Sequence, residues 1–244
     1  MRSSRSRQAE LARLGARPFA HRGLHGCGLA ENSGGAVAAA VAQGHGVELD
    51  VQLSRDGEAM VFHDHDLDRL TAEKGPVAER SAAELQAIEL KIGGEVMPRL
   101  AEILETIGGR APLLVEVKSP DRRVERLCAA VAKALEAYRG PVGVMSFNPQ
   151  VGSWFARHSP HVLRGLVVTE SGRRGLRGRI ERPVALWRAR ADFLAYDIRD
   201  LPSRFAGAAR RLGLPVYAWT VRSDPDRARA AAHADQIIFE APPA

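Results

Sequence analysis

The segment VELDVQLSRDGEAMVFHD, residues 47–64, concentrates side chains that could do chemistry. Glu48 and Asp50 stand two residues apart, so an extended strand points both to one face. His63 follows after a short polar turn, and its imidazole can transfer a proton near neutral pH. Carboxylates on an otherwise apolar strand are costly to bury unless solvent or a bound cation compensates them. The pattern predicts a metal site with a proton-transfer histidine beside it.

Two halves of this segment are separated only by SRDG, residues 54–57. That spacing is too short for the crossover that joins parallel strands, so it predicts an antiparallel hairpin. A two-residue turn at Asp56-Gly57 would pair Asp50 with His63, and a turn at Arg55-Asp56 would pair Glu48 with His63. Either register brings the imidazole close to the carboxylates.

A second histidine stands at the end of the first expected strand, in the stretch AHRG. His21 and Arg22 stand at its carboxyl end, where barrel enzymes place catalytic groups. The arginine fork suits phosphate oxygens, and His21 could exchange a proton. The alternative is a structural histidine next to a surface arginine.

A third acidic strand is expected in PLLVEVKSP, where Glu116 and Lys118 share one face. The two could form a structural ion pair. Together with Glu48 and Asp50, however, Glu116 completes a three-carboxylate oxygen set. Hard cations such as Mg²⁺ or Ca²⁺ prefer such ligands, whereas zinc favours histidine or thiolate. Lys118 would then balance the carboxylates or bind a phosphate.

Strand-like segments alternate with helical ones along the chain, which indicates repeated βαβ units. The nine expected strands are RPFAHR, GVELDVQL, EAMVFHD, PLLVEVK, VGVMSF, LRGLVV, DFLAYD, VYAWTV and QIIF. The expected helices are 33–43, 82–88, 100–106, 122–137, 149–158, 202–212 and 225–233. Setting aside the returning arm of the hairpin leaves eight parallel strands. The predicted fold is therefore an α/β (β/α)₈ TIM-type barrel with a short β-hairpin extension after the second strand. A doubly wound open sheet is the alternative.

The 244 residues contain no linker rich in Pro, Gly or Ser, which favours one large domain. We expect a basic N-terminal arm over residues 1–16, including a short helix, and a single catalytic barrel domain over residues 17–244. No apolar run approaches the ~20 residues of a membrane span. The N-terminus lacks the apolar stretch of a secretory signal, and the two cysteines have no metal spacing. We therefore expect a cytoplasmic location.

The net charge of +6 comes almost wholly from arginine. Such charge attracts phosphates on nucleic acid, lipid headgroups or small metabolites. The densest run, RRGLRGRIERPVALWRAR over residues 173–190, has no interleaved aromatic platform for bases. We interpret it as a solvated arginine-rich face and expect no nucleic-acid partner; a peripheral membrane contact is left open as an alternative.

Several motifs occur in the order seen in glycerophosphodiester phosphodiesterases, from about Pro18 to the C-terminus. They are AHRG, AENS, VELDVQLSRDGEAMVFHD, LDRLT, VEVK, SF and AWTV. The chain resembles this family over nearly its whole length. The resemblance implies a (β/α)₈ barrel with a divalent metal, Mg²⁺ or Ca²⁺, that hydrolyses small glycerophosphodiesters to sn-glycerol 3-phosphate and an alcohol.

The resemblance also implies roles for individual side chains. These are His21 and His63 as the acid/base pair, with His63 as the leaving-group acid; Arg22 as the phosphate clamp; Glu48, Asp50 and Glu116 as metal ligands; Lys118 as a further phosphate contact; Trp219 beside the glycerol moiety; and Glu31 and Asn32 near the metal.

Some positions depart from the family pattern. Phe239 and Glu240 replace the usual Thr-Asp, and Arg222 follows AWTV in place of a common asparagine. These changes put substrate preference in question. A lysophospholipase D-like activity on lysophospholipids, favoured by an apolar channel and a membrane-binding surface, is one alternative. A non-catalytic barrel that binds phosphodiesters is another, disfavoured because every proposed catalytic position is occupied.

Overall fold

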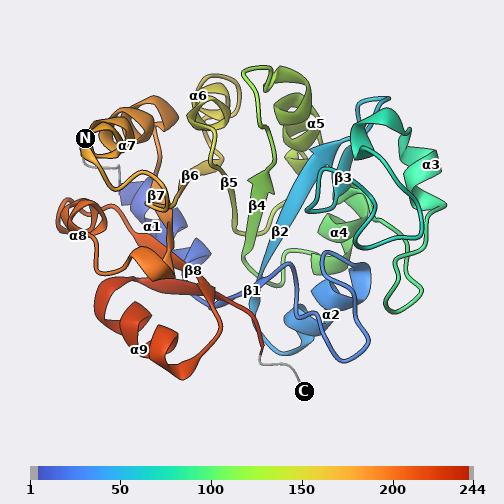
Figure 1. The fold of residues 1–244 in the computed structure, drawn as a ribbon, viewed down its shortest axis with the longest axis horizontal. Coiled ribbons are helices and arrows are strands. Elements are labelled where there is room, and N and C mark those ends of the chain that lie inside the picture. Colours follow the sequence, from blue (N-terminus) through green and yellow to red (C-terminus); the bar gives the residue numbers. More distant parts are fainter. Residues whose placement is uncertain (1–4, 242–244) are drawn as a thin grey trace.

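Eight parallel strands form a closed barrel in the computed structural model, which describes residues 5–241 (Figure 1). The hydrogen-bonded order is β1-β9-β8-β7-β6-β5-β4-β2, and pairing of β1 with β2 closes the ring. β3 pairs antiparallel with β2 outside this ring. The strands are β1 (Phe19–His21), β2 (Gly46–Leu53), β3 (Ala59–Val61), β4 (Leu113–Val117), β5 (Val142–Ser146), β6 (Leu163–Val168), β7 (Phe193–Asp197), β8 (Val216–Val221) and β9 (Gln236–Phe239). The predicted (β/α)₈ barrel is confirmed.

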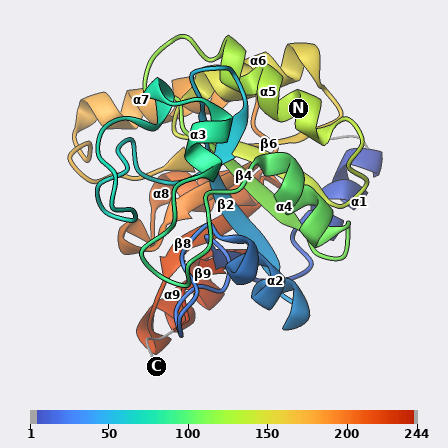
Figure 2. The same ribbon diagram turned by 90° about the vertical axis from the view of Figure 1, so that its right-hand side faces the viewer.

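Helices connect the parallel strands and surround the barrel (Figures 1 and 2). They are α1 (Arg5–Leu14), α2 (Gly34–Ala42), α3 (Ala82–Gln86), α4 (Leu100–Ile107), α5 (Glu125–Leu135), α6 (Pro149–His158), α7 (Leu176–Ala189), α8 (Arg204–Arg211) and α9 (Asp224–His233), with 3₁₀ turns at Val77–Glu79 and Ile198–Asp200. Each expected helix lies within a few residues of its predicted bounds.

Helix α7 is the element that the sequence analysis did not predict. The arginine run over residues 173–190, interpreted there only as a charged face, folds into this helix of 14 residues. Gly178 and Ala189 are buried on its inner side, and Ala185 and Leu186 pack against the core between strands and helices. The dense arginines conceal this weak inward apolar pattern in the sequence.

The interior of the barrel is a separate apolar core. Its members come from alternate positions of the strands, because successive side chains of a strand point in and out of the barrel. Two inward positions are glycines: a Cβ at Gly165 would lie 2.3 Å from the Phe193 ring, and one at Gly143 would lie 2.9 Å from Leu14. The interior is therefore a filled core and not a channel.

Helix α1 contributes to this interior core. Leu11 and Leu14 are buried in the same cluster as Phe19, Phe193 and Tyr217. The Arg7 guanidinium donates to Asp192 and to the Val162 carbonyl oxygen, which fixes the helix on the barrel. The short helix expected near the N-terminus thus shares a hydrophobic core with the strands.

The hairpin forms, but both predicted registers are wrong. Val51 pairs with Val61 and Leu53 with Ala59, and the ladder ends there, before His63; this register differs by one position from both predicted ones and aligns His63 with neither Glu48 nor Asp50. The loop has three residues, 55–57, closed by a hydrogen bond from Ser54 N to Glu58 O at 3.0 Å. Gly57 has φ +94°, the left-handed conformation that ends this common three-residue loop. One additional loop residue shifts the pairing by one position.

A long excursion over residues 62–99 follows β3 and includes α3. It has its own apolar cluster, in which Phe62, Leu67, Leu85 and Met97 are buried. This packing fixes the segment that carries His63 over the barrel end. No helix within residues 5–241 combines the length and apolar character needed to cross a bilayer.

Packing of α1 predicts a measurable contribution to stability. Leu14 is fully buried, so Leu14→Ala should lower the free energy of unfolding by about 2–5 kcal/mol through lost burial and a cavity. Urea unfolding followed by circular dichroism measures this change. Leu212→Ala, at a side chain that is 85% exposed, is the control and should change stability by less than about 0.5 kcal/mol. Equal midpoints for the two variants would contradict this role of α1.

Candidate active site

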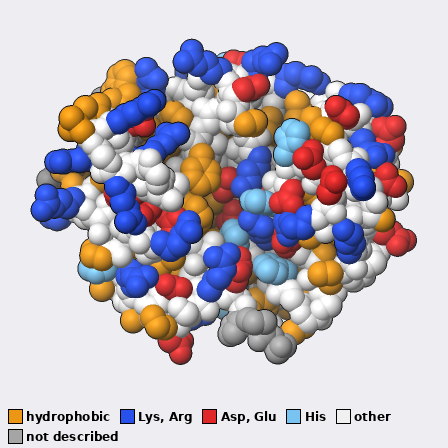
Figure 3. Space-filling view, in the orientation of Figure 1, with side chains coloured by type: hydrophobic (Ala, Val, Ile, Leu, Met, Phe, Trp, Pro, Cys, Tyr) orange, Lys and Arg blue, Asp and Glu red, His pale blue; other side chains and the backbone are white. Residues whose placement is uncertain are grey.

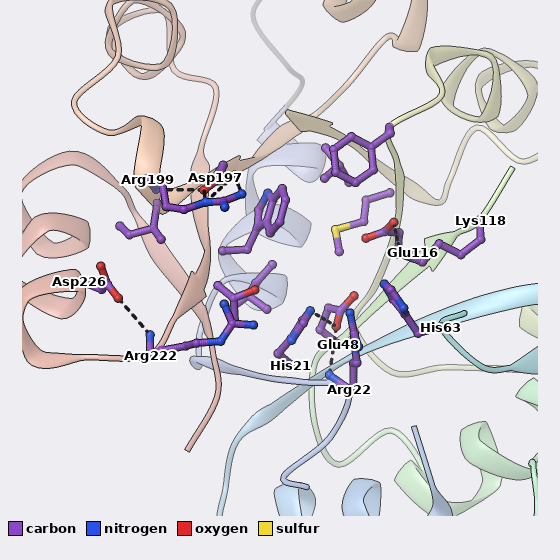
Figure 4. A pocket seen from close by; sticks show the side chains of 17 residues that line it. His21, Arg22, Glu48, His63, Glu116, Lys118, Asp197, Arg199, Arg222 and Asp226 are labelled. Atoms are coloured by element: carbon purple, nitrogen blue, oxygen red, sulfur yellow. Dashed lines mark hydrogen bonds and ion pairs between the residues drawn. The ribbon is translucent and has the colours of Figure 1, made fainter. Parts of the chain in front are cut away.

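A cavity of about 380 Å³ opens at the carboxyl ends of the barrel strands (Figures 3 and 4). This is the end at which (β/α)₈ enzymes hold their active sites. Its walls combine charged and apolar side chains. Those used below are His21, Arg22, Glu48, His63, Glu116, Lys118, Phe147, Trp219 and Arg222.

Three carboxylates meet beside the cavity, as predicted. Parallel pairing places Glu48 beside His21 and Asp50 beside Glu116. One oxygen from each of Glu48, Asp50 and Glu116 lies within 4.8 Å of the others, and all three residues are buried. Strand spacing and register therefore suffice to gather the acidic side chains.

Asp50 receives much of the nearby positive charge. Lys118 Nζ lies 2.8 Å from Asp50 Oδ1, and Arg22 Nε lies 3.3 Å from Oδ2. Asn32 Nδ2 donates to Oδ2 at 3.0 Å. Burial alone would raise the pKa of Asp50, but Lys118 and Arg22 outweigh it and hold this pKa well below its ordinary value.

Glu48 and Glu116 are balanced less completely. Burial raises the pKa of Glu48, and repulsion from Asp50 and Glu116 raises it further. Burial also raises the pKa of Glu116, although Lys118 Nζ lies 2.7 Å from its Oε1. Glu48 Oε1 is buried and has no hydrogen-bond partner in the described part of the chain. An all-oxygen donor set with an unpartnered oxygen fits a hard divalent cation.

Arg22 is placed by an unusual backbone conformation. Its φ is +57°, in the left-handed region that a residue with a side chain rarely adopts. This turn directs the Arg22 N–H to Glu48 Oε2 at 3.1 Å. The guanidinium contacts Glu31 at 2.7 Å as well as Asp50. Although burial opposes it, attraction to Asp50 and Glu31 raises the pKa of Arg22, so the group stays charged.

His21 is held by a carboxylate from the far end of the chain. Its Nδ1 lies 2.7 Å from Glu240 Oε1, and its Nε2 lies 3.8 Å from Glu48 Oε2. Arg222 in turn donates to both Glu240 oxygens, at 2.6 and 2.7 Å. Burial lowers the pKa of His21, and the Glu240 contact opposes that shift. An Nδ1–H donated to Glu240 leaves Nε2 as the proton acceptor in the neutral ring.

His63 is held in the same way as His21, by a carboxylate that an arginine contacts. Its Nδ1 lies 2.7 Å from Asp64 Oδ1, and Arg69 donates to the same carboxylate. Arg69 also contacts Glu31, the partner of Arg22, at 2.7 Å. Arg69 and His63 hold the pKa of Asp64 at about 2, so it stays ionised. Burial lowers the pKa of His63. Each imidazole is thus oriented by a carboxylate that an arginine holds.

Trp219 lies in the wall of the cavity, where its ring meets Phe147 edge to face with centroids 5.7 Å apart. Its indole N–H is buried without a hydrogen-bond partner among residues 5–241. An unpaired donor at this place can bind an oxygen of a ligand.

The structure brings together the predicted residues His21, Arg22, Glu48, Asp50, His63, Glu116, Lys118 and Trp219. Asn32 contacts Asp50, whereas Glu31 contacts Arg22 and Arg69. Four partners were given no site role from the sequence: Glu240, Arg222, Asp64 and Arg69. Asp64 follows His63 directly and Arg69 lies within the LDRLT motif, so both were visible in the sequence. Glu240 stood out in the sequence only as a residue unlike the one expected from the motifs, and nothing there linked it to His21.

Known structures identify the class to which this barrel belongs, the (β/α)₈ phosphodiesterases. A phosphodiesterase from Oleispira antarctica, solved in complex with the product sn-glycerol-3-phosphate, has a TM-score of 0.79 and 25% identity, with 91% of each chain covered. A putative glycerophosphoryl diester phosphodiesterase from Silicibacter pomeroyi has a TM-score of 0.77 and 25% identity, covering 95% of this chain and 94% of that one.

Sequence comparison then gives the family. The model of the glycerophosphoryl diester phosphodiesterase family matches residues 21–242, so the chain belongs to this family of enzymes that hydrolyse glycerophosphodiesters. A glycerophosphodiester phosphodiesterase from Caldanaerobacter subterraneus subsp. tengcongensis is 29% identical over 212 residues, covering 81% of this chain and 82% of that protein. One from Bacillus altitudinis is 32% identical over 155 residues, covering 59% and 63%. The family expected from the motifs is confirmed.

The contact between Glu240 and His21 leads to a prediction. Glu240→Gln removes the anion that accepts the Nδ1–H, so we expect kcat to fall by about 10- to 100-fold with little change in KM. Glu240 raises the pKa of His21, so its loss should also move the limb of the pH–rate profile that belongs to His21 to lower pH. Steady-state kinetics against pH measures both effects.

Glu79→Gln, at an exposed acid outside the cavity, is the matched control and should leave the profile unchanged. Arg222→Gln should move kcat in the same direction as Glu240→Gln, by a smaller factor. An unchanged kcat and pH profile in Glu240→Gln would show that His21 is oriented by other groups.

Proposed function

We propose that this enzyme hydrolyses glycerophosphodiesters to sn-glycerol 3-phosphate and an alcohol, with a bound divalent cation and with proton transfer by His21 and His63. The strongest support is the meeting of three buried carboxylates, one with an unpartnered oxygen, between two imidazoles. The bound sn-glycerol-3-phosphate of the Oleispira antarctica phosphodiesterase supports the product assignment.

Glu48, Asp50 and Glu116 would hold the cation. Mg²⁺ and Ca²⁺ suit their oxygen atoms, and the buried, unpartnered Glu48 Oε1 is the donor most in need of one. When bound, the ion neutralises negative charge on the phosphate and acts as a Lewis acid. Its two positive charges would also oppose the burial and the repulsion from Asp50 and Glu116 that together raise the pKa of Glu48.

Arg22 and Lys118 would bind the phosphate oxygens. Both line the cavity and both have a raised pKa, so they remain cationic throughout the neutral pH range. Arg22 offers a planar fork, and Lys118 offers a compact charge above Asp50 and Glu116. Charge that grows on the phosphate oxygens in the transition state would be stabilised by these fixed cations.

His21 and His63 would move the protons. Nε2 of one neutral imidazole accepts a proton from the attacking hydroxyl, whose oxygen forms a new bond to phosphorus. The second imidazole, in its protonated form, donates a proton to the leaving alkoxide oxygen as its bond to phosphorus breaks. His63 is the proposed donor. Asp64 and Glu240 favour the protonated rings, while burial favours the neutral ones, so both forms remain accessible.

Trp219 would lie against the glycerol moiety, with its unpaired indole N–H available to a hydroxyl oxygen. The adjoining apolar wall contains Met145, Phe147, Val167 and Ile238. Phe147 is 48% exposed at the mouth, so a long apolar leaving group would also find contacts here. This observation keeps a lysophospholipase D-like activity on lysophospholipids as the second candidate.

Metal dependence gives the test of the proposed function. Glycerophosphocholine, glycerophosphoethanolamine and lysophospholipids are incubated with chelated enzyme and then with Mg²⁺ or Ca²⁺. We expect glycerol 3-phosphate from the soluble diesters only after metal is added. Alcohol release from lysophospholipids, with lysophosphatidic acid as the other product, would support the second candidate. Full turnover in excess chelator would refute the metal requirement.

Thermal unfolding gives a readout independent of turnover. Metal at 100 times its Kd should stabilise the wild type by about 2.7 kcal/mol and raise Tm by several degrees. Glu116→Gln should lose that shift and more than about 100-fold of activity, whereas Glu79→Gln keeps both. An intact metal-induced shift in Glu116→Gln would place the ion elsewhere.

The two histidines should be separable by leaving group. Each alanine variant should lose about 10²–10⁴-fold in kcat on a natural diester. On a p-nitrophenyl diester, whose leaving phenolate needs no proton, His63→Ala should recover most of the loss and His21→Ala should not. Recovery by His21→Ala instead would exchange the two roles, and full turnover by either variant on the natural diester would remove that residue from the chemistry.

A further inference from the structure

Helix α7 has two apolar faces, and only one of them meets the barrel. Ala185 and Leu186 pack against the core, and Gly178 and Ala189 are buried. On the opposite side, four large side chains face solvent. They are Leu176 at 72% exposure, Ile180 at 58%, Val184 at 41% and Trp187 at 78%.

These four residues fall on one side of the helix and define a stripe along it. At 100° per residue, positions 176, 180, 184 and 187 fall within an arc of about 80°, opposite the buried face. The rise from the first to the last is about 16 Å. Apolar side chains are visible in the region of α7, at the upper left of Figure 3, on the face into which the active-site cavity opens. Among residues 5–241, half of the large apolar side chains that are exposed lie on this helix.

Arginines border the stripe on both sides. Arg177 and Arg188 fall on one margin of the helix and Arg179 on the other, with Arg173 and Arg174 just before its first turn. Glu181 is the single acid of the helix, and it is already paired with Arg177 at 2.6 Å and Arg173 at 3.5 Å. A second copy of the chain would bring like charges together here, whereas an anionic surface would be attracted.

We infer that α7 is an interfacial helix that docks the enzyme on the surface of an anionic phospholipid bilayer. An exposed apolar stripe that contains a tryptophan and is bordered by arginines is the pattern of helices that lie in the plane of the headgroups. The stripe enters the headgroup region, and the arginines contact lipid phosphates. The start of α7 lies at the mouth end of the barrel, where Arg174 contacts Asp200 at 3.0 Å, so docking keeps the cavity near the bilayer.

The test uses the full-length protein and extruded vesicles of phosphatidylcholine alone or with 30% phosphatidylglycerol, in about 0.1 M salt. We expect binding at least about tenfold tighter to the anionic vesicles, and weakened by added salt. Ile180→Ser with Trp187→Ser should weaken it by at least about tenfold. Arg179→Gln with Arg188→Gln should weaken it by roughly fivefold for each arginine. Leu212→Ser, an exposed leucine at the end of α8, is the matched control and should bind as the wild type does.

Trp187 provides a direct signal, since its emission should shift to the blue on the vesicles. Trp187→Phe should bind but lose the shift, because Trp154 is buried and Trp219 lies in the cavity wall. Hydrolysis of a soluble diester should be unchanged in every variant, so this inference can fail independently of the proposed function. Equal binding of the stripe variants and the wild type, or no binding to anionic vesicles, would overturn it. So would a wild-type dimer in sedimentation that Ile180→Ser with Trp187→Ser dissociates.

Discussion

Repulsion among three buried carboxylates is the constraint to which the rest of the site is fitted. Oxygens of Glu48, Asp50 and Glu116 lie within 4.8 Å of one another, so each ionised pair repels by on the order of 3–4 kcal/mol at an effective dielectric constant of about 20. Arg22 and Lys118 offset part of this repulsion. Burial, together with the repulsion that remains, raises the pKa values of Glu48 and Glu116. A cation is the missing charge in this arrangement, which supports the proposed metal.

Carboxylates balanced by arginines also surround the two histidines. Glu240 and Arg222 form one pair behind His21, and Asp64 and Arg69 form another behind His63. In both pairs the arginine fixes the carboxylate, and the carboxylate fixes the tautomer and the direction of the ring. Glu240 and Arg222 are two of the positions noted in the sequence as unlike the motifs of the family it resembles, and the structure puts them in contact. Their placement links these departures to the orientation of His21, in addition to any effect on substrate preference.

The fold and the centre of the site were predictable because they depend on local periodicity. Strand-like segments that alternate with helical ones, less the returning arm of the hairpin, predicted the eight parallel strands, and the two-residue spacing of Glu48 and Asp50 predicted their common face. The hairpin register was missed because two- and three-residue loops both suit the sequence around Gly57, and the choice depends on one backbone conformation. Helix α7 was missed because its largest apolar residues face solvent and do not mark a core face. The link from His21 to Glu240 joins residues 219 positions apart, a contact that only barrel closure creates.

Barrel closure also divides the interior into an apolar floor and a polar mouth. Along β4 the inward side chains change from Leu114 to Glu116, and along β1 they change from Phe19 to His21. Leu14 of α1 closes the base beneath them, next to Gly143. Water can therefore approach the carboxylates only from the mouth. A dry floor keeps the local dielectric constant low, and this strengthens every charge interaction above it, repulsive and attractive alike. The same packed interior therefore stabilises the closed end of the barrel and strengthens the charge interactions of the site at the other end.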